Sequence, residues 1–152
     1  MTVLENSIHI DATPERVWAT LASLDLLEKY DPAVTRSEIV SAERTGPGSA
    51  RRCDLRPGGW FKERVADWRP NESLSFELYE CTLPVRRLRH SYTLVADAGG
   101  TLVTQRMEYD LKFGVVGRAL DALMVRRKWV GGIRTFFAGL KRHVESKTSG
   151  LS

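Results

Sequence analysis

Turn-forming residues divide the middle of the chain into short segments of similar length, and this spacing limits the possible folds more than any other feature. Turns rich in glycine and proline recur between residues 46 and 114. The segments between them alternate apolar and polar side chains, which is the period of a strand with one buried face. Joined by such short turns, the strands form an antiparallel meander. The six predicted strands are Thr35–Ala42, Ser49–Leu55, Trp60–Trp68, Leu74–Thr82, Arg87–Ala96 and Thr101–Lys112.

Helical patterns flank this meander. Ser7–Ile10 predicts a further strand, and Thr13-Pro14 after it is a typical helix start, with Thr13 as the N-cap. A second short apolar helix follows over residues 24 to about 30. Residues 115 to about 145 contain no proline and predict one long helix, although Gly131-Gly132 allows a kink. Its apolar stripe comprises Leu120, Leu123, Met124, Val130, Ile133, Phe137, Leu140 and Val144.

The order of these elements predicts the architecture. An antiparallel sheet with one apolar face must cover that face, and the long C-terminal helix is the element available to do so. We therefore expect an α+β fold in which a strongly curved seven-stranded antiparallel sheet wraps around that helix on its concave face. With 152 residues there is no room for a second core, so we expect one domain over residues 1–147 and a flexible tail over residues 148–152.

Composition excludes several classes of protein. A hydrophobic fraction of 42% and a charged fraction of 28% are typical of a soluble globular chain. No run of about 18 apolar residues is present to span a membrane. The first ten residues lack the basic and apolar segments of a signal peptide, so we expect a cytoplasmic protein. Cys53 and Cys81 have no CxxC spacing and no nearby histidine, and we expect two free thiols, no metal and no cofactor.

Basic residues concentrate near the C-terminus of a chain whose formal net charge is +4. Eight lysines and arginines lie between Arg118 and Lys147, opposed by Asp121 and Glu145. The cluster Arg126-Arg127-Lys128 fits an electrostatic contact with anionic lipid or nucleic acid. It also fits the solvated face of the long helix, with basic stems covering apolar neighbours, and we favour this second interpretation. We expect no nucleic-acid partner and at most a peripheral membrane contact through this helix.

Three stretches of the chain, taken in order, carry a family resemblance. They are IHIDATPERVWATLASLDLLEKYDP, GPGSARRCDLRPGGWFKERVADWRPNESLSFEL and GGTLVTQRMEYDLKF. They resemble the opening, the middle hairpins and the end of the START-like (SRPBCC) superfamily, the helix-grip fold of Bet v 1, START lipid-transfer domains and polyketide aromatase/cyclases. The resemblance covers residues 3–146 and is strongest to bacterial proteins labelled polyketide cyclase/dehydrase-like. It implies a cavity for an apolar small molecule between the sheet and the long helix.

Strand alternation assigns side chains to that interior. Arg51 and Glu63, on adjacent strands, are expected inside as a pair, but an ordinary pair on the solvated face fits equally well. A bulge of one residue would turn either side chain to the other face. His90 fits either a hydrogen-bonded core histidine or a catalytic one, and we favour the core histidine. The residues expected to contact a ligand are Arg51, Phe61, Glu63, Phe76, Leu78, His90, Tyr92, Gln105, Met107 and Tyr109 on strands, and Leu120, Met124 and Phe137 on the long helix.

Three functions are compatible with these residues, since binders, transporters, cyclases and co-chaperones share such folds. The first is binding or transport of a hydrophobic small molecule, lipid or polyketide-like, with Arg51, His90 and Gln105 orienting its polar end. The second is a polyketide cyclase or aromatase, with His90 or Glu63 as general base and Arg51 or Tyr92 polarising the carbonyl. The third is a protein-interaction domain of the co-chaperone or toxin type, which a filled interior would favour.

Overall fold

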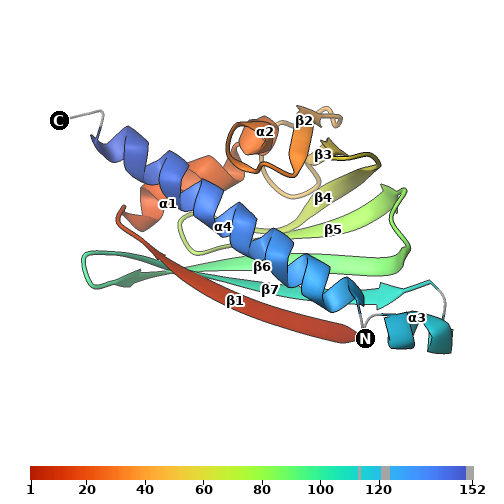
Figure 1. Cartoon of the computed structure of the whole chain (residues 1–152). Coiled ribbons are helices and arrows are strands. Elements are labelled where there is room, and N and C mark those ends of the chain that lie inside the picture. Colours follow the sequence, from red (N-terminus) through yellow and green to blue (C-terminus); the bar gives the residue numbers. More distant parts are fainter. Residues whose placement is uncertain (113, 121–123, 150–152) are drawn as a thin grey trace.

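A curved antiparallel sheet and one long helix form the two layers of the protein (Figure 1). The computed structural model describes residues 1–112, 114–120 and 124–149. The strands are β1 (Thr2–Ile10), β2 (Val34–Ile39), β3 (Ala50–Leu55), β4 (Trp60–Arg69), β5 (Ser73–Cys81), β6 (Val85–Asp97) and β7 (Gly100–Leu111). The helices are α1 (Pro14–Ala22), α2 (Leu27–Tyr30) after a 3-10 turn at Leu24–Leu26, α3 (Gly114–Leu120) and α4 (Arg126–Ser149). The predicted fold class is confirmed.

Strand pairing follows the predicted meander. The order in the sheet is β1-β7-β6-β5-β4-β3-β2, so each strand from β2 onward pairs with the next, and β1 pairs with β7. β1 begins at Thr2 rather than at Ser7, and its pairing with β7 runs from Thr2 opposite Tyr109 to Ile10 opposite Thr101. At the other end of β1, Thr13 caps α1 as expected, since its hydroxyl accepts a hydrogen bond from the Arg16 amide at 3.4 Å.

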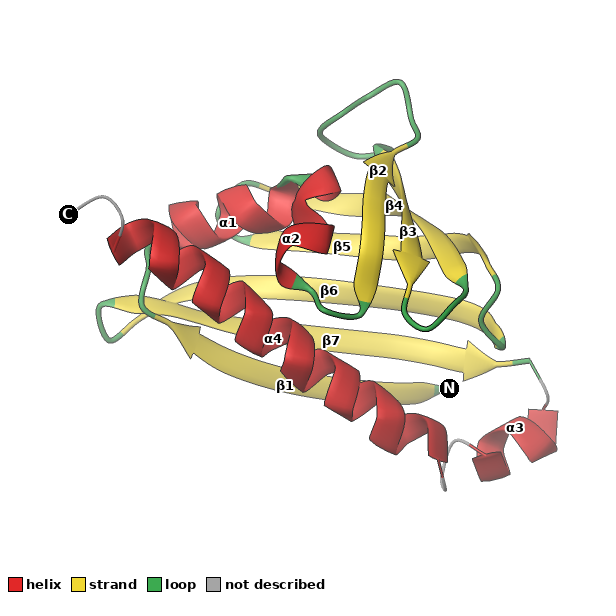
Figure 2. Cartoon of the chain, turned by 45° about the horizontal axis from the view of Figure 1, so that its top comes forward, coloured by secondary structure: helices red, strands yellow, loops and turns green. Residues whose placement is uncertain are grey.

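Helix α4 crosses the concave face of the sheet, as Figure 2 shows. Its buried side chains are Ile133, Phe136, Phe137, Leu140 and Val144, all at most 7% exposed. Four of them belong to the predicted stripe, and full burial stabilises each apolar side chain by about 1.5–3 kcal/mol. The helix continues through Gly131-Gly132 without a break.

The C-terminal helical region is divided where we predicted one continuous helix. α3 and α4 are separate helices, and Leu123 of the predicted stripe lies outside the described residues. Leu120 and Met124, expected inside, are 41% and 66% exposed, so their assignment to the interior is wrong. The 24 residues of α4 span about 36 Å, and the 12 residues of β7 span about 40 Å. α4 alone therefore covers the concave face along its length, and α3 has no part of it left to cover.

The C-terminal end of α4 extends into the expected tail. The helix ends at Ser149, and residues 150–152 lie outside the described part of the chain. No helix among the described residues is long and apolar enough to cross a membrane. The cytoplasmic location stays a prediction.

Candidate functional site

Three polar side chains meet inside the curved sheet: Arg51 from β3, Glu63 from β4 and His90 from β6. Arg51 and Glu63 lie opposite each other in the β3–β4 register and are 4% and 1% exposed. Arg51 Nε donates a hydrogen bond to Glu63 Oε1 at 2.8 Å, and its guanidinium also donates to the Leu24 carbonyl at 3.2 Å. His90 Nε2 lies 2.6 Å from Glu63 Oε2. The pair is therefore buried and extended by a histidine, rather than exposed on the solvated face.

Charge keeps Glu63 ionised in this cluster. Burial alone would raise the pKa of its carboxyl, but the nearby His90 and Arg51 outweigh burial and hold that pKa at about 2. An ionised carboxylate only accepts hydrogen bonds, so Nε2 of His90 carries a proton and donates a hydrogen bond to Glu63. Nδ1, the other ring nitrogen, accepts a hydrogen bond when the ring is neutral and donates one when it is protonated. This atom is buried without a hydrogen-bond partner among the described residues.

Aromatic rings surround the cluster and connect it to a second polar pair. The Arg51 guanidinium lies 4.5 Å from the centroid of the Phe76 ring, and Phe76 stacks on His90 with centroids 5.1 Å apart. Beside them Gln105 Nε2 donates to the Tyr92 hydroxyl at 3.1 Å, while Gln105 Oε1 has no partner among the described residues. Burial raises the pKa of the Tyr92 hydroxyl, which keeps it protonated.

The interior is closed at one end of the sheet and less covered at the other. Near α1 and the C-terminal half of α4, five apolar side chains are at most 2% exposed: Ile10, Leu74, Val103, Leu140 and Val144. Toward the N-terminal end of α4, several apolar side chains that face the core are half-buried: Phe61, Leu78, Met107, Trp129 and Val130. We call this second region the open end.

The predicted ligand contacts divide between these regions. Phe61, Leu78 and Met107 lie at the open end, and Arg51, Glu63, Phe76, His90, Tyr92 and Gln105 form the polar and aromatic cluster next to it. Tyr109 is 1% exposed and is covered by Trp129, with ring centroids 4.3 Å apart. Phe137 is buried in the core under α4. Leu120 and Met124 contribute nothing to the interior.

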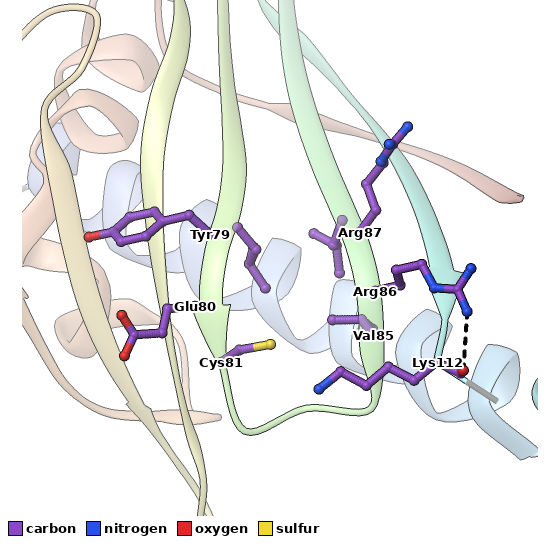
Figure 3. Close-up of a pocket in the computed structure, with 9 residues that line it drawn as sticks. Tyr79, Glu80, Cys81, Val85, Arg86, Arg87 and Lys112 are labelled. Atoms are coloured by element: carbon purple, nitrogen blue, oxygen red, sulfur yellow. Dashed lines mark hydrogen bonds between the residues drawn. The ribbon is translucent and has the colours of Figure 1, made fainter.

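A groove that the sequence did not predict opens between β5 and β6 (Figure 3). The two strands pair from Ser73–Thr93 to Glu77–Arg89 and then separate. Each strand carries an extra residue beyond that point, Tyr79 in β5 and Arg86 in β6, and such bulges disrupt pairing. The groove has a volume of about 360 Å³ and is lined by Leu78, Tyr79, Glu80, Cys81, Val85, Arg86, Arg87, Leu88 and Lys112.

One local signal could have indicated the groove. Val85 and Leu88 are both buried, yet they are three residues apart, whereas a regular strand places same-face residues two or four apart. The bulge lies at the two arginines between them. Figure 3 shows Cys81 and Val85 pointing toward each other across the gap, with Arg86 and Lys112 beside them. Arg86 donates a hydrogen bond to the Lys112 carbonyl at 3.4 Å.

Comparison with known proteins identifies the family. Residues 1–145 match the family described as polyketide cyclase/dehydrase and lipid transport. The chain belongs to this family. The predicted resemblance to the START-like superfamily is thereby confirmed, and family and fold together support a domain that binds a hydrophobic ligand. No curated protein sequence matches the chain. Among the described residues, no group of three or more histidine, cysteine or acidic side chains could hold a metal ion.

Solved structures share the fold at low identity. The protein TTHA0849 from Thermus thermophilus is 21% identical, with a TM-score of 0.82, over 96% of this chain and 99% of that one. A START superfamily protein from Mycobacterium smegmatis is 16% identical, with a TM-score of 0.79, over 95% and 97%. The ginseng major latex-like protein 151 from Panax ginseng is 14% identical, with a TM-score of 0.77, over 93% and 96%. Identities this low establish the fold and leave the ligand open.

Proposed function

We propose that the protein binds or carries a hydrophobic small molecule, lipid or polyketide-like, between the sheet and α4. The observation that supports this most is the open end, where Phe61, Leu78 and Met107 face inward but are only half-buried. They lead to a buried polar cluster, and an apolar site with a few convergent polar groups is the usual form of a small-molecule site. Each Å² of apolar ligand surface removed from water contributes about 25 cal/mol to affinity.

The unpaired groups specify the polar end of that ligand. Glu63 and the Leu24 carbonyl already engage Arg51, so its guanidinium is not free to bind a carboxylate. The buried atoms left without partners among the described residues include His90 Nδ1 and Gln105 Oε1, and the amide oxygen of Gln105 is an acceptor. A buried acceptor is costly unless a donor reaches it. A ligand hydroxyl or another hydrogen-bond donor would satisfy Gln105 Oε1, whereas an ionised carboxylate has no proton to donate to it.

Cyclase chemistry receives less support from the same cluster. A general base works best with a pKa near the working pH, and Glu63 is held at a pKa of about 2 by two hydrogen-bonded partners. Tyr92 has a pKa raised by burial, which makes it a weaker acid than an ordinary tyrosine. Arg51 is occupied by Glu63. Arg51 and Glu63 hold each other in place and Tyr92 is held by Gln105, which suits orientation of a ligand better than proton transfer.

The proposal is tested by native mass spectrometry of the purified protein and by mass analysis of a solvent extract. A panel of sterols, long-chain alcohols, fatty acids and aromatic polyketides then measures affinity. We expect hydroxylated compounds to bind more tightly than carboxylates of the same chain length. Failure of every class to bind, with nothing co-purifying, would contradict the proposal and favour a protein-interaction domain.

A variant locates the bound molecule. Met107→Trp adds a bulky ring at the open end, and we expect it to lower affinity by at least about tenfold because the ring occupies ligand volume. Val95→Trp is the matched control, since Val95 is 53% exposed and faces away from the interior. Leu78→Phe, a smaller enlargement at the same end, keeps the test usable if Met107→Trp does not fold. Equal affinity in all three variants would place the ligand elsewhere.

A further inference from the structure

The segment between β7 and α4 concentrates the charge of the whole chain. Residues 112–129 contain five basic residues and one acidic residue, Asp121, so their formal charge equals the net charge of the protein, +4. Asp121 lies outside the described residues. The basic side chains are Lys112, Arg118, Arg126, Arg127 and Lys128, and all five are exposed. The rest of the chain has equal numbers of basic and acidic residues, so the excess positive charge of the protein lies in this segment.

The same segment exposes apolar side chains to an unusual extent. Val115, Val116, Leu120 and Met124 are 78%, 65%, 41% and 66% exposed. They make up four of the nine large hydrophobic side chains that are exposed in the described part of the chain, and they lie within ten residues of one another. Every residue of α3 with a described exposure is exposed, so none of its described side chains belongs to the buried core. Apolar patches of this kind mark contact surfaces.

The two features lie at one end of the molecule. Figures 1 and 2 both show α3 beyond the C-terminal end of β7, next to the first turn of α4. The groove between β5 and β6 is adjacent, because Lys112 lines it and α3 begins two residues later. The groove adds two further exposed cations, Arg86 and Arg87, while its acidic residue Glu80 lies 3.6 Å from Lys62. Exposed apolar side chains are thus surrounded by positive charge.

We propose that this end of the protein docks on an anionic lipid membrane. The apolar side chains of α3 enter the boundary between head groups and acyl chains, as apolar faces of peripheral helices do. The surrounding arginines and lysines, with Arg86 and Arg87 of the groove, face the lipid phosphates. A second copy of the chain fits this surface poorly, since two segments of charge +4 would be brought together. The proposal does not depend on which molecule the interior binds.

Vesicle flotation tests this surface with the full chain. One set of vesicles contains phosphatidylcholine alone, and in the other about one quarter of the lipid is phosphatidylglycerol, which supplies the negative surface potential. We expect binding to the anionic vesicles and little to the neutral ones. Raising the salt to about 0.5 M shortens electrostatic range to a few Å and should release the protein.

Three sets of substitutions separate charge from apolar insertion. Arg126→Gln/Arg127→Gln/Lys128→Gln should weaken binding on the order of a hundredfold, at about fivefold per charge. The triple variant Arg36→Gln/Arg44→Gln/Arg69→Gln has the same net charge and should bind nearly as well as the wild type. Arg86→Gln/Arg87→Gln should weaken binding by about thirtyfold, at the same loss per charge.

Asparagine substitutions test the apolar side chains. Val115→Asn/Val116→Asn should weaken binding on the order of tenfold without changing the melting temperature, because both side chains are exposed. Val40→Asn/Val95→Asn, at exposed positions elsewhere, should leave binding unchanged. Equal binding to both kinds of vesicle would overturn the proposal. So would an equal loss of affinity in the triple variant at residues 126–128 and in its control at Arg36, Arg44 and Arg69. A change of oligomeric state in Val115→Asn/Val116→Asn would overturn it too, because it would make α3 a contact between protein chains.

Discussion

Replacing Glu63 by glutamine tests whether the buried cluster contributes the stability that its geometry implies. Glu63→Gln keeps the shape of the side chain but leaves Arg51 as a buried charge without a counter-ion. Removing one partner of a buried ion pair costs about 3–5 kcal/mol. The pKa gives an independent figure, since lowering it from 4.5 to about 2 corresponds to about 3 kcal/mol of folding free energy. We therefore expect Glu63→Gln to lower the free energy of unfolding by about 3 kcal/mol at pH 7.

The pH dependence of that loss of stability shows whether the Glu63 carboxylate is its cause. Because the pKa of Glu63 is lowered in the folded state, its stabilising contribution is complete above about pH 5. The contribution is lost as pH falls from 4.5 toward 2, where the folded protein also takes up the proton. Urea denaturation of wild type and Glu63→Gln across this range should show the two stabilities converge. A difference that stays constant from about pH 7 to about pH 2 would refute the assignment of the loss to this carboxylate.

The chain offers a control with the same substitution and the same kind of partner. Glu77 Oε1 accepts a hydrogen bond from Arg89 at 2.7 Å, close to the Arg51–Glu63 distance, but the Glu77 side chain is 49% exposed. Surface pairs contribute about 0–1 kcal/mol, so Glu77→Gln should have little effect. Adding Arg51→Met to Glu63→Gln should restore stability, because it removes the unpaired cation. Equal losses for Glu63→Gln and Glu77→Gln would show that burial does not set the energy of these pairs.

Two further predictions concern packing. Burial raises the pKa of the Cys53 thiol to about 12. Iodoacetamide at about pH 8 should therefore modify the half-buried Cys81 and leave Cys53 unmodified until the protein is denatured. Mass spectrometry counts the modified thiols, and equal rates of modification at Cys53 and Cys81 would contradict this difference in burial. Gly139→Ala should lower the free energy of unfolding by about 2 kcal/mol, because its new methyl group would overlap the Tyr30 carbonyl. Gly131→Ala lies in the same helix, but its methyl group meets no neighbour, so it should raise the free energy of unfolding by about 1 kcal/mol. Thermal melts of the two alanine variants check this contrast, and losses of similar size in both would contradict it.

The sequence predicted the sheet well because its signals are local. Turn residues and alternation mark every strand, and the Thr13-Pro14 cap marks α1. The sequence did not predict the division between α3 and α4. Apolar residues keep their helical spacing in the sequence whether or not the helix lies on the sheet. Only the length of the concave face decides where the covering helix stops, and that length depends on strands far away in the chain.

The candidate site was likewise predictable from the sequence only in part. Hairpin pairing made Arg51 and Glu63 predictable neighbours, but alternation left both faces open, and only the structure shows that the pair is buried. The contact of His90 with Glu63 reaches across β5, from β4 to β6, so it depends on the curvature of the sheet rather than on any neighbouring residues in the sequence. The groove depends on two bulges, Tyr79 and Arg86, that lie in different strands. Either bulge alone would bend one strand, and their coincidence opens the gap.

The presence of this cluster also carries an argument about function. A buried ion pair is costly to desolvate, and well-packed apolar side chains in its place are often equally stabilising. Stability alone therefore does not account for an arginine, a glutamate and a histidine in the core. The Arg51 guanidinium is engaged with Glu63, while His90 Nδ1 and Gln105 Oε1 have no partner among the described residues and lie near the half-buried Met107. Its polar groups are thus fixed by one another before any ligand arrives, and such preorganisation lowers the entropic cost of orienting a bound molecule.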